Sequence, residues 1–249
     1  MVNASFKMKK YDCKFYCYKK TREHDYLKPE KMDKLELVIF DMDGVLTDIT
    51  SSWKYIHDFF KTSNERSVDE YLKGEIDDME FIKRDVSLWK ENGKLITQDR
   101  LVEILSEVPF MNGADRCIKI LKDKNIKTAI VSAGLDLLAK RTAKKLKIDY
   151  VKSNGIKTDE FGRLTGDGIL NVRLMYKDLA VKSLLKDLKI PFGRVASVGN
   201  SCFDIPMFKI TGLGIAFNPA DDCTREAADF IVQDKDLSKI LTVFESYLP

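Results

Sequence analysis

Two aspartates separated by one residue are the first side chains in this sequence with evident chemistry. Asp41 and Asp43 directly follow the apolar run LVIF, and Gly44 comes next, where a sharp backbone turn is easy. Two carboxylates this close are costly unless they share a proton or a cation, and hard oxygen ligands favour Mg²⁺. With phosphate beside that cation, Asp41 can act as a nucleophile and Asp43 as an acid and then a base.

Three further polar groups follow later in the chain. Ser132 ends the run KTAIVS and precedes Ala133–Gly134 and a predicted helix start, where a hydroxyl and free N–H groups can cradle phosphate. Lys177 opens the helical stretch KDLAVKSLLKDL and can offset charge on a transferring phosphoryl group. Asn200 and Asp204 follow RVASVG as oxygen ligands or supports for them. Each group alone is an ordinary turn, cap or surface residue, but their joint order favours one site.

Short apolar runs alternate with helical stretches and supply the elements that must position these groups. The strand-like runs are 35–40, 126–131, 149–151, 195–198, 213–217 and 230–232; the helical ones are 117–121, 135–146, 179–188 and the segment from 237. This alternation predicts the α/β class, a Rossmann-like doubly wound parallel sheet. Ligands of such sheets bind beyond the carboxyl ends of the strands, where the four polar groups fall. Residues 155–168 carry turn signals that predict a hairpin excursion.

The chain divides into an extension, a core and an insert. Residues 1–34 form a basic N-terminal extension, and 35–48 together with 109–249 form the predicted α/β core. Residues 49–108 are highly charged and helical in pattern, without a good strand; Phe81, Ile82, Val86 and Trp89 suit one apolar stripe of a helix. We expect this insert to be an all-helical cap over the carboxyl edge of the sheet.

The composition limits the partners and the location. The formal net charge is +3, too balanced to favour nucleic acid, and the ten basic and five acidic residues of positions 1–34 carry the excess. No apolar run approaches the roughly 20 residues that span a bilayer, and the N-terminus lacks a secretory pattern. The five scattered cysteines predict reduced thiols in a cytoplasmic protein, with Cys13, Cys17 and His24 favoured as ordinary side chains over a metal site. A homodimer stays an open alternative to a monomer.

The quoted motifs resemble those of the haloacid dehalogenase superfamily. The segment DMDGVLTD is similar to its DxDG(T/V)L signature, and Ser132, Lys177 and GNSCFD are similar to its second, third and fourth motifs, in order. The resemblance covers about residues 35 to 240. Within the superfamily, the segments AIVSAGLDLL, LTGDG and DIPMF resemble the phosphoserine phosphatase branch most.

The resemblance implies a role for each matched residue. Asp41 would be the nucleophile and Asp43 the acid and base; Ser132 and the Ala133 amide would bind phosphate; and Lys177 would bridge phosphate and Asp41. The metal, Mg²⁺, would be held by the Asp41 side chain, the Asp43 carbonyl and the fourth motif, that is, Asn200 and Asp204.

Four positions depart from the family pattern. Asn200 stands where an aspartate is usual, which predicts weaker metal binding. Thr50 replaces the glutamate that binds the amine of phosphoserine, Asp85 replaces the arginine that binds its carboxylate, and Phe203 replaces an asparagine. Arg84 is adjacent to Asp85 but points about 100° away on a helix, so a one-residue shift of the alignment would be needed to give it the carboxylate role.

The sequence therefore favours a magnesium-dependent phosphomonoesterase for a small phosphorylated metabolite. Phosphoserine phosphatase proper and a phosphotransferase or mutase, which would use the same four motifs, are alternatives. A non-catalytic binding protein is the least favoured of them.

Overall fold

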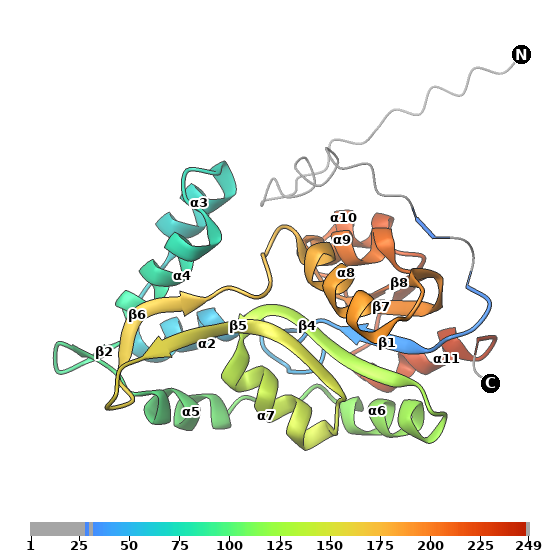
Figure 1. The fold of residues 1–249 in the computed structure, drawn as a ribbon, viewed down its shortest axis with the longest axis horizontal. Helices are drawn as coiled ribbons and strands as arrows, with labels where there is room; N and C mark the ends of the chain where they lie inside the picture. The colour runs from blue at the N-terminus through green and yellow to red at the C-terminus, as the bar shows by residue number, and fades with distance from the viewer. Residues whose placement is uncertain (1–27, 30–31, 248–249) are drawn as a thin grey trace, which may run out of the picture.

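A seven-stranded, mostly parallel sheet forms the centre of the computed structural model, which describes residues 28–29 and 32–247 (Figure 1). The strand order is β6-β5-β4-β1-β7-β8-β9, and only β6 runs antiparallel to its neighbour. The strands are β1 (Leu37–Phe40), β4 (Lys127–Leu135), β5 (Tyr150–Thr158), β6 (Leu164–Ile169), β7 (Val195–Gly199), β8 (Leu213–Phe217) and β9 (Phe230–Val232). The predicted doubly wound α/β fold is confirmed.

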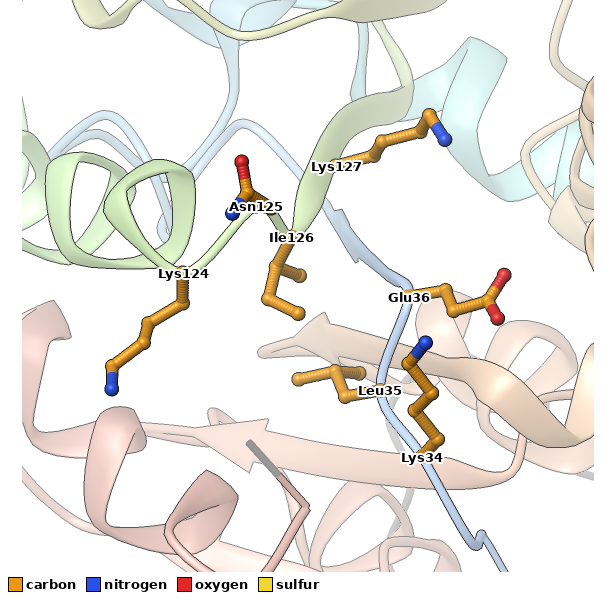
Figure 2. A pocket seen from close by; sticks show the side chains of 7 residues that line it. All are labelled: Lys34, Leu35, Glu36, Lys124, Asn125, Ile126 and Lys127. Atoms are coloured by element: carbon orange, nitrogen blue, oxygen red, sulfur yellow. The ribbon is translucent and has the colours of Figure 1, made fainter. Parts of the chain in front are cut away.

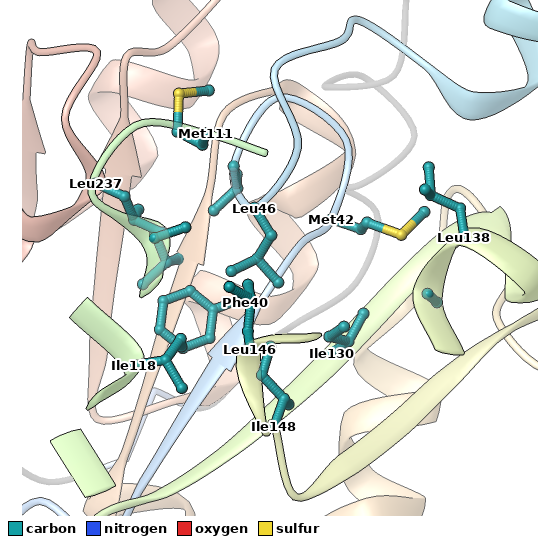
Figure 3. Packing of buried hydrophobic residues seen from close by; sticks show 14 of the residues in the cluster. Phe40, Met42, Leu46, Met111, Ile118, Ile130, Leu138, Leu146, Ile148 and Leu237 are labelled. Atoms are coloured by element: carbon teal, nitrogen blue, oxygen red, sulfur yellow. The ribbon is translucent and has the colours of Figure 1, made fainter. Parts of the chain in front are cut away.

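Helices cover both faces of the sheet. On one face lie α6 (Ala114–Asp123) and α7 (Asp136–Leu146), and on the other α8 (Lys177–Leu188) and α9 (Ile205–Ile210) (Figure 1). Successive residues of a strand point to opposite faces, so Val38 and Phe40 join the core cluster beside α6 and α7, whereas Leu37 and Ile39 join the one beside α8 and α9. All residues of β1 are therefore buried, and Figure 3 shows Phe40 within the first cluster.

The central position of β1 decides where the first motif lies. Phe40 pairs with Ile130 of β4 on one side and with Val198 of β7 on the other. Asp41 continues this ladder through its N–H, which donates to the Val198 carbonyl at 2.9 Å. The residues after β1, β4 and β7 consequently meet at one edge of the sheet.

The segment after Val131 differs from the prediction. β4 continues through Ser132 to Leu135, with a register shift between Val131 and Leu135, and α7 begins only at Asp136. The helix predicted over 135–146 is present as α7, but the strand predicted over 126–131 is longer than expected, so the bulged end of β4, and not the N-terminus of a helix, carries Ser132 and Ala133. The predicted hairpin is present as the antiparallel pair β5–β6.

The insert contains four helices, α2 (Ser52–Phe60), α3 (Glu65–Lys73), α4 (Asp78–Ser87) and α5 (Gln98–Ser106). It also contains two short antiparallel strands, β2 (Lys90–Glu91) and β3 (Lys94–Leu95), so the expectation of an all-helical insert is wrong. Asn92 and Gly93 between them have φ values of 51° and 75°, the left-handed pair that a tight two-residue hairpin turn requires.

The remaining segments complete the core. They are α10 (Asp222–Ala227), the 3₁₀ turn Leu237–Ile240 and α11 (Leu241–Phe244). Met32, which the sequence analysis assigned to the extension, is buried in the core cluster. The hypotheses on Cys13, Cys17 and His24 lie outside the described residues. None of the described helices is long and apolar enough to cross a membrane.

Candidate active site

A cavity of about 400 Å³ lies between the carboxyl edge of the sheet and the insert. Residues from both parts of the chain line it, and among them are nearly all of the predicted site residues: Asp41, Asp43, Thr50, Asp85, Ser132, Ala133, Lys177, Asn200 and Phe203. Asp204 does not line the cavity itself but forms an ion pair with Lys177, which does, and Arg84 does not line the cavity. We call the sheet side of this cavity its floor and the insert side its roof.

Lys177 connects two carboxylates on the floor. Its Nζ lies 2.9 Å from Asp41 Oδ1 and donates to Asp204 Oδ1 at 2.7 Å, and all three side chains are buried. Burial lowers the pKa of Lys177, but Asp204 and Asp41 outweigh that effect and raise it overall, so the side chain is an ammonium. Burial raises the pKa of Asp41 to about 6, with Lys177 opposing the rise and Asp204 and Asp43 adding to it. A nucleophilic carboxylate here thus needs further positive charge to stay ionised at lower pH.

Asp43 is held by the first residue of α2. Its Oδ2 accepts from the Ser52 N–H at 2.7 Å and from the Ser52 hydroxyl at 2.8 Å. Burial raises the pKa of Asp43 and the two Ser52 hydrogen bonds oppose that rise. Gly134 makes this contact possible, because a Cβ there would lie 2.7 Å from Ser52 Oγ and 2.9 Å from Asp43 Oδ2.

The C-terminal end of β4 is held in place by hydrogen bonds. Ser132 Oγ accepts from the Gly134 N–H at 3.2 Å, within the segment predicted to bind phosphate. The Ala133 carbonyl accepts from Trp53 Nε1 at 3.0 Å and from Asn154 Nδ2 at 3.2 Å. The carbonyl is thus occupied, while the Ser132 hydroxyl stays in the cavity wall.

The fourth motif has a different role for each of its two residues. Asp204 Oδ2 accepts from the N–H groups of Asn200 and Ser201 at 2.9 and 3.0 Å, and its Oδ1 is bonded to Lys177. Both oxygens are engaged, so the expectation of Asp204 as a metal ligand is not supported; it positions Lys177 and the loop. The Asn200 amide packs on Gly44, whose Cβ position would be 2.1 Å from Asn200 Nδ2 and whose φ of +78° suits glycine.

The floor fits a divalent cation in charge and in donor chemistry. Three buried carboxylates, Asp41, Asp43 and Asp204, share one lysine, which leaves two negative charges for a dication to balance. Among the described residues, no group of three His, Cys, Asp or Glu side chains is placed to hold a metal. A metal here would therefore also need amide or main-chain oxygens, which are hard donors of the kind Mg²⁺ accepts.

Of the four positions that depart from the family pattern, Thr50 and Asp85 belong to the insert, whereas Asn200 and Phe203 follow β7 in the core. Thr50 and Phe203 line the cavity, and Asp85 is buried in its wall with 2% of its surface exposed. Arg84 instead pairs with Glu70 and Glu80 on the insert. The alternative in which a one-residue shift brings Arg84 to the substrate has no support in this geometry.

Sequence reasoning missed several residues of the site. Ser52, Trp53, Asn64 and Asn154 all contact its walls, yet none belongs to a recognised motif. A local signal existed only for Ser52, since serines at 51 and 52 before an apolar stripe mark a helix start.

The expectation of reduced thiols is wrong for Cys202, which is disulfide-bonded.

A second cavity, of about 260 Å³, lies at the opposite edge of the sheet (Figure 2). Three lysines dominate its charged lining, which consists of Lys34, Leu35, Glu36, Lys124, Asn125, Ile126 and Lys127. None of these residues belongs to the four motifs, so this cavity is separate from the candidate active site.

Comparison with known proteins agrees with the fold and identifies the family. The profile of haloacid dehalogenase-like hydrolases matches residues 35–212, and this chain belongs to that family. The phosphoserine phosphatase of Methanocaldococcus jannaschii is 27% identical over 84% of this chain and 97% of its own. That of Campylobacter jejuni subsp. doylei is 30% identical over 84% of this chain and 99% of its own.

Solved structures give the same result. A substrate-bound phosphoserine phosphatase complex superposes with a TM-score of 0.72 at 26% identity, covering 85% of this chain and 99% of that one. A phospho-aspartyl intermediate analogue of phosphoserine phosphatase gives a TM-score of 0.69 at 27% identity, covering the same 85% of this chain and 99% of that one. The resemblance to the superfamily, and within it to the phosphoserine phosphatase branch, is confirmed, as is the prediction of a phosphatase-type hydrolase.

Proposed function

We propose that the protein is a magnesium-dependent phosphomonoesterase that cleaves a small phosphorylated metabolite through an aspartyl-phosphate on Asp41. The observation that carries the proposal is the buried Asp41–Lys177–Asp204 chain with Asp43 beside it. The relatives whose structures include a substrate complex and a phospho-aspartyl intermediate analogue support the same chemistry.

Each floor residue has a step in the proposed reaction. A carboxylate oxygen of Asp41 attacks phosphorus and the bond to the leaving oxygen breaks, while Asp43 gives that oxygen its proton. In the second half, Asp43 takes a proton from water, which attacks the aspartyl-phosphate and releases phosphate from Asp41. Lys177, the Ser132 hydroxyl and the Ala133 amide stabilise the charge on the transferring group.

The cation would lie between the first and fourth motifs. The Asp41 side chain, the Asp43 carbonyl and the Asn200 amide oxygen would hold Mg²⁺, which supplies positive charge to the phosphate oxygens. Asn200 brings no charge of its own, so we expect this cation to bind more weakly than it would to an aspartate.

Two features of the roof bear on the alternatives. Phosphoserine phosphatase proper is the nearest alternative because of the relatives' names, but Asp85 faces the cavity in which a substrate carboxylate would have to dock. A phosphotransferase would use the same floor and needs an acceptor hydroxyl in place of water. A cytoplasmic location and the choice between monomer and homodimer stay predictions.

Phosphate release from a panel of esters tests the proposal. The panel contains phosphoserine, sugar phosphates, nucleotides and an aryl phosphate, each with Mg²⁺ and with EDTA. We expect release only with Mg²⁺, and a fall of about 10⁴-fold or more in kcat for Asp41→Asn. Equal release by Asp41→Asn, or release that survives EDTA, would contradict the aspartyl-phosphate mechanism.

A further inference from the structure

The buried carboxylate of Asp85 is the central feature of the roof. Asn64 Nδ2 donates to its two oxygens at 3.1 and 3.0 Å, and His57 Nε2 lies 3.4 Å from Oδ2. Asn64 occupies the N-cap of α3 but makes no side-chain cap, so its amide is committed to Asp85 and not to its own helix. The site is therefore built around the carboxylate.

His57 does not neutralise that carboxylate. Trp89 Nε1 lies 3.3 Å from His57 Nδ1, and an indole N–H can only donate, so Nδ1 is an acceptor. The Thr62 hydroxyl, 2.9 Å from the same nitrogen, can donate to it as well. The single proton of the ring is then on Nε2, toward Asp85, and the imidazole is neutral. Asp85 therefore accepts from one uncharged donor, the Asn64 amide, and lies beside a neutral imidazole whose Nε2 makes no hydrogen bond.

No cation of the cavity is available to Asp85. Within the described part of the chain, the lysines that line the cavity are Lys54 and Lys177. Lys54 pairs with Asp58 at 2.6 Å, and Lys177 is bound by two floor carboxylates. No arginine or lysine of the described residues lies within ion-pair distance of Asp85.

The other acid of the roof has its own cation. Asp78 accepts from Tyr71 Oη at 2.9 Å and from the Leu174 N–H at 3.0 Å, and it pairs with Arg173 at 3.1 Å. Asp85 is consequently the one carboxylate of the roof, among the described residues, whose charge is left without a positive partner. An unpaired buried charge is costly, and a bound cation would remove that cost.

The walls around Asp85 suit an organic cation. Aromatic side chains line the same cavity, including Trp53, Tyr71 and Phe81, and the last two stack with their centroids 5.0 Å apart. Aromatic rings together with a carboxylate bind alkylammonium groups through cation–π and charge interactions. A carboxylate on the substrate would meet repulsion at the same place.

We propose that the alcohol half of the substrate carries a protonated amine and no carboxylate, and that this amine binds to Asp85. The proposal rests on the phosphomonoesterase function proposed above and identifies its substrate class as the phosphate esters of small amino alcohols. Asn64 is a positioning residue, whose amide holds both oxygens of the carboxylate.

Three esters of similar size test the proposal, with the full-length chain in saturating Mg²⁺. They are phosphoethanolamine, which has an ammonium group, propyl phosphate, which is neutral, and phosphoglycolate, which has a carboxylate. A charge-assisted hydrogen bond predicts a kcat/KM for phosphoethanolamine about tenfold or more above that for propyl phosphate. Phosphoglycolate should be the poorest, and phosphoserine should fall below phosphoethanolamine.

Asp85→Asn should remove this selectivity while keeping the shape of the side chain. The ratio of the phosphoethanolamine value to the propyl phosphate value should fall from about tenfold to about one. Glu80→Gln is the matched control, because Glu80 lies on the same helix, pairs with Arg84 and does not line the cavity. Equal values for the three esters in the wild type, or unchanged selectivity in Asp85→Asn, would overturn the proposal; if Asp85→Asn does not fold, the wild-type order alone decides.

Binding separates this proposal from the proposed function. Calorimetry of the same esters on Asp41→Asn reports the preference without turnover, and phosphoethanolamine should bind about tenfold more tightly than propyl phosphate. Absence of Asp41-dependent turnover for every ester, including an aryl phosphate, would refute the phosphomonoesterase function but not this preference. Turnover without a preference for phosphoethanolamine over propyl phosphate would refute the amine site alone. The amine site would also be refuted if the best substrate of the ester panel carried neutral hydroxyl groups and no amine.

Discussion

The floor and the roof of the cavity solve the problem of buried charge in different ways. On the floor, Lys177 lies between Asp41 and Asp204, and Asp43 has two hydrogen bonds from Ser52. On the roof, Asp85 accepts from the neutral amide of Asn64 and lies 3.4 Å from His57 Nε2. Under the two proposals, the floor carries out the reaction for any alcohol, whereas the charge on Asp85 in the roof selects which alcohol binds. Reaction type and substrate choice are therefore separable in this protein.

Lys177→Met is the strongest test of the floor. It leaves Asp41 and Asp204 buried without their cation, which should lower the free energy of unfolding by about 3–5 kcal/mol and kcat/KM by about 10³-fold. Urea unfolding without Mg²⁺ and phosphate release with Mg²⁺ measure the two effects. Lys186→Met, an exposed position on the same helix, is the control. A stable and active Lys177→Met protein would show that the floor carboxylates do not need this lysine.

Ser52→Ala tests the hydrogen bond between the insert and Asp43. It removes the hydroxyl that donates to Asp43 and accepts from the Leu135 N–H at 3.0 Å, so kcat should fall by about 10²-fold, with little change in KM. Steady-state kinetics on propyl phosphate, in which the roof plays no part, isolates this effect. Ser87→Ala, an exposed serine of the insert, should have wild-type kinetics. A changed KM with constant kcat would instead assign Ser52 to substrate binding.

Asn200→Asp has the smallest expected effect and concerns metal affinity alone. A carboxylate adds charge to the predicted ligand set, so the Mg²⁺ concentration for half-maximal activity should fall by about tenfold. A magnesium titration after EDTA treatment measures it for both proteins. An unchanged midpoint would place Asn200 outside the ligand set, and the roof selectivity should be the same in either case.

The floor could be predicted from the sequence because its residues follow strands. Asp41, Ser132 and Lys177 each come at the end of a strand or at the first residue of a helix, and the topology of a parallel sheet brings such positions together. The role of Asp204 could not be predicted in this way. Whether it binds metal or supports Lys177 depends on the fold of the loop before the 3₁₀ turn Cys202–Asp204, because the N–H groups of Asn200 and Ser201 donate to one of its oxygens.

The roof was harder to predict from the sequence, because its contacts join segments whose separation along the chain follows no motif. The resemblance to the family singled out Asp85, but its neighbours His57 and Asn64 come from α2 and from the N-cap of α3. No pattern in the sequence indicated that Asn64 would leave its own helix uncapped. The short hairpin around Asn92 and Gly93 was missed although Asn-Gly is a strong turn signal, because the flanking residues are charged and exposed.

Ser52 makes the orientation of Asp43 depend on the first turn of α2, where the insert begins. Its N–H and hydroxyl hold Asp43 from the first turn of α2, and its hydroxyl also accepts from the N–H of Leu135, the last residue of β4. A displacement of that turn by about one ångström lengthens all three hydrogen bonds beyond a useful distance. In the proposed mechanism, the Ser52 hydroxyl therefore keeps Asp43 aligned for proton transfer only while the first turn of α2 stays in contact with the end of β4.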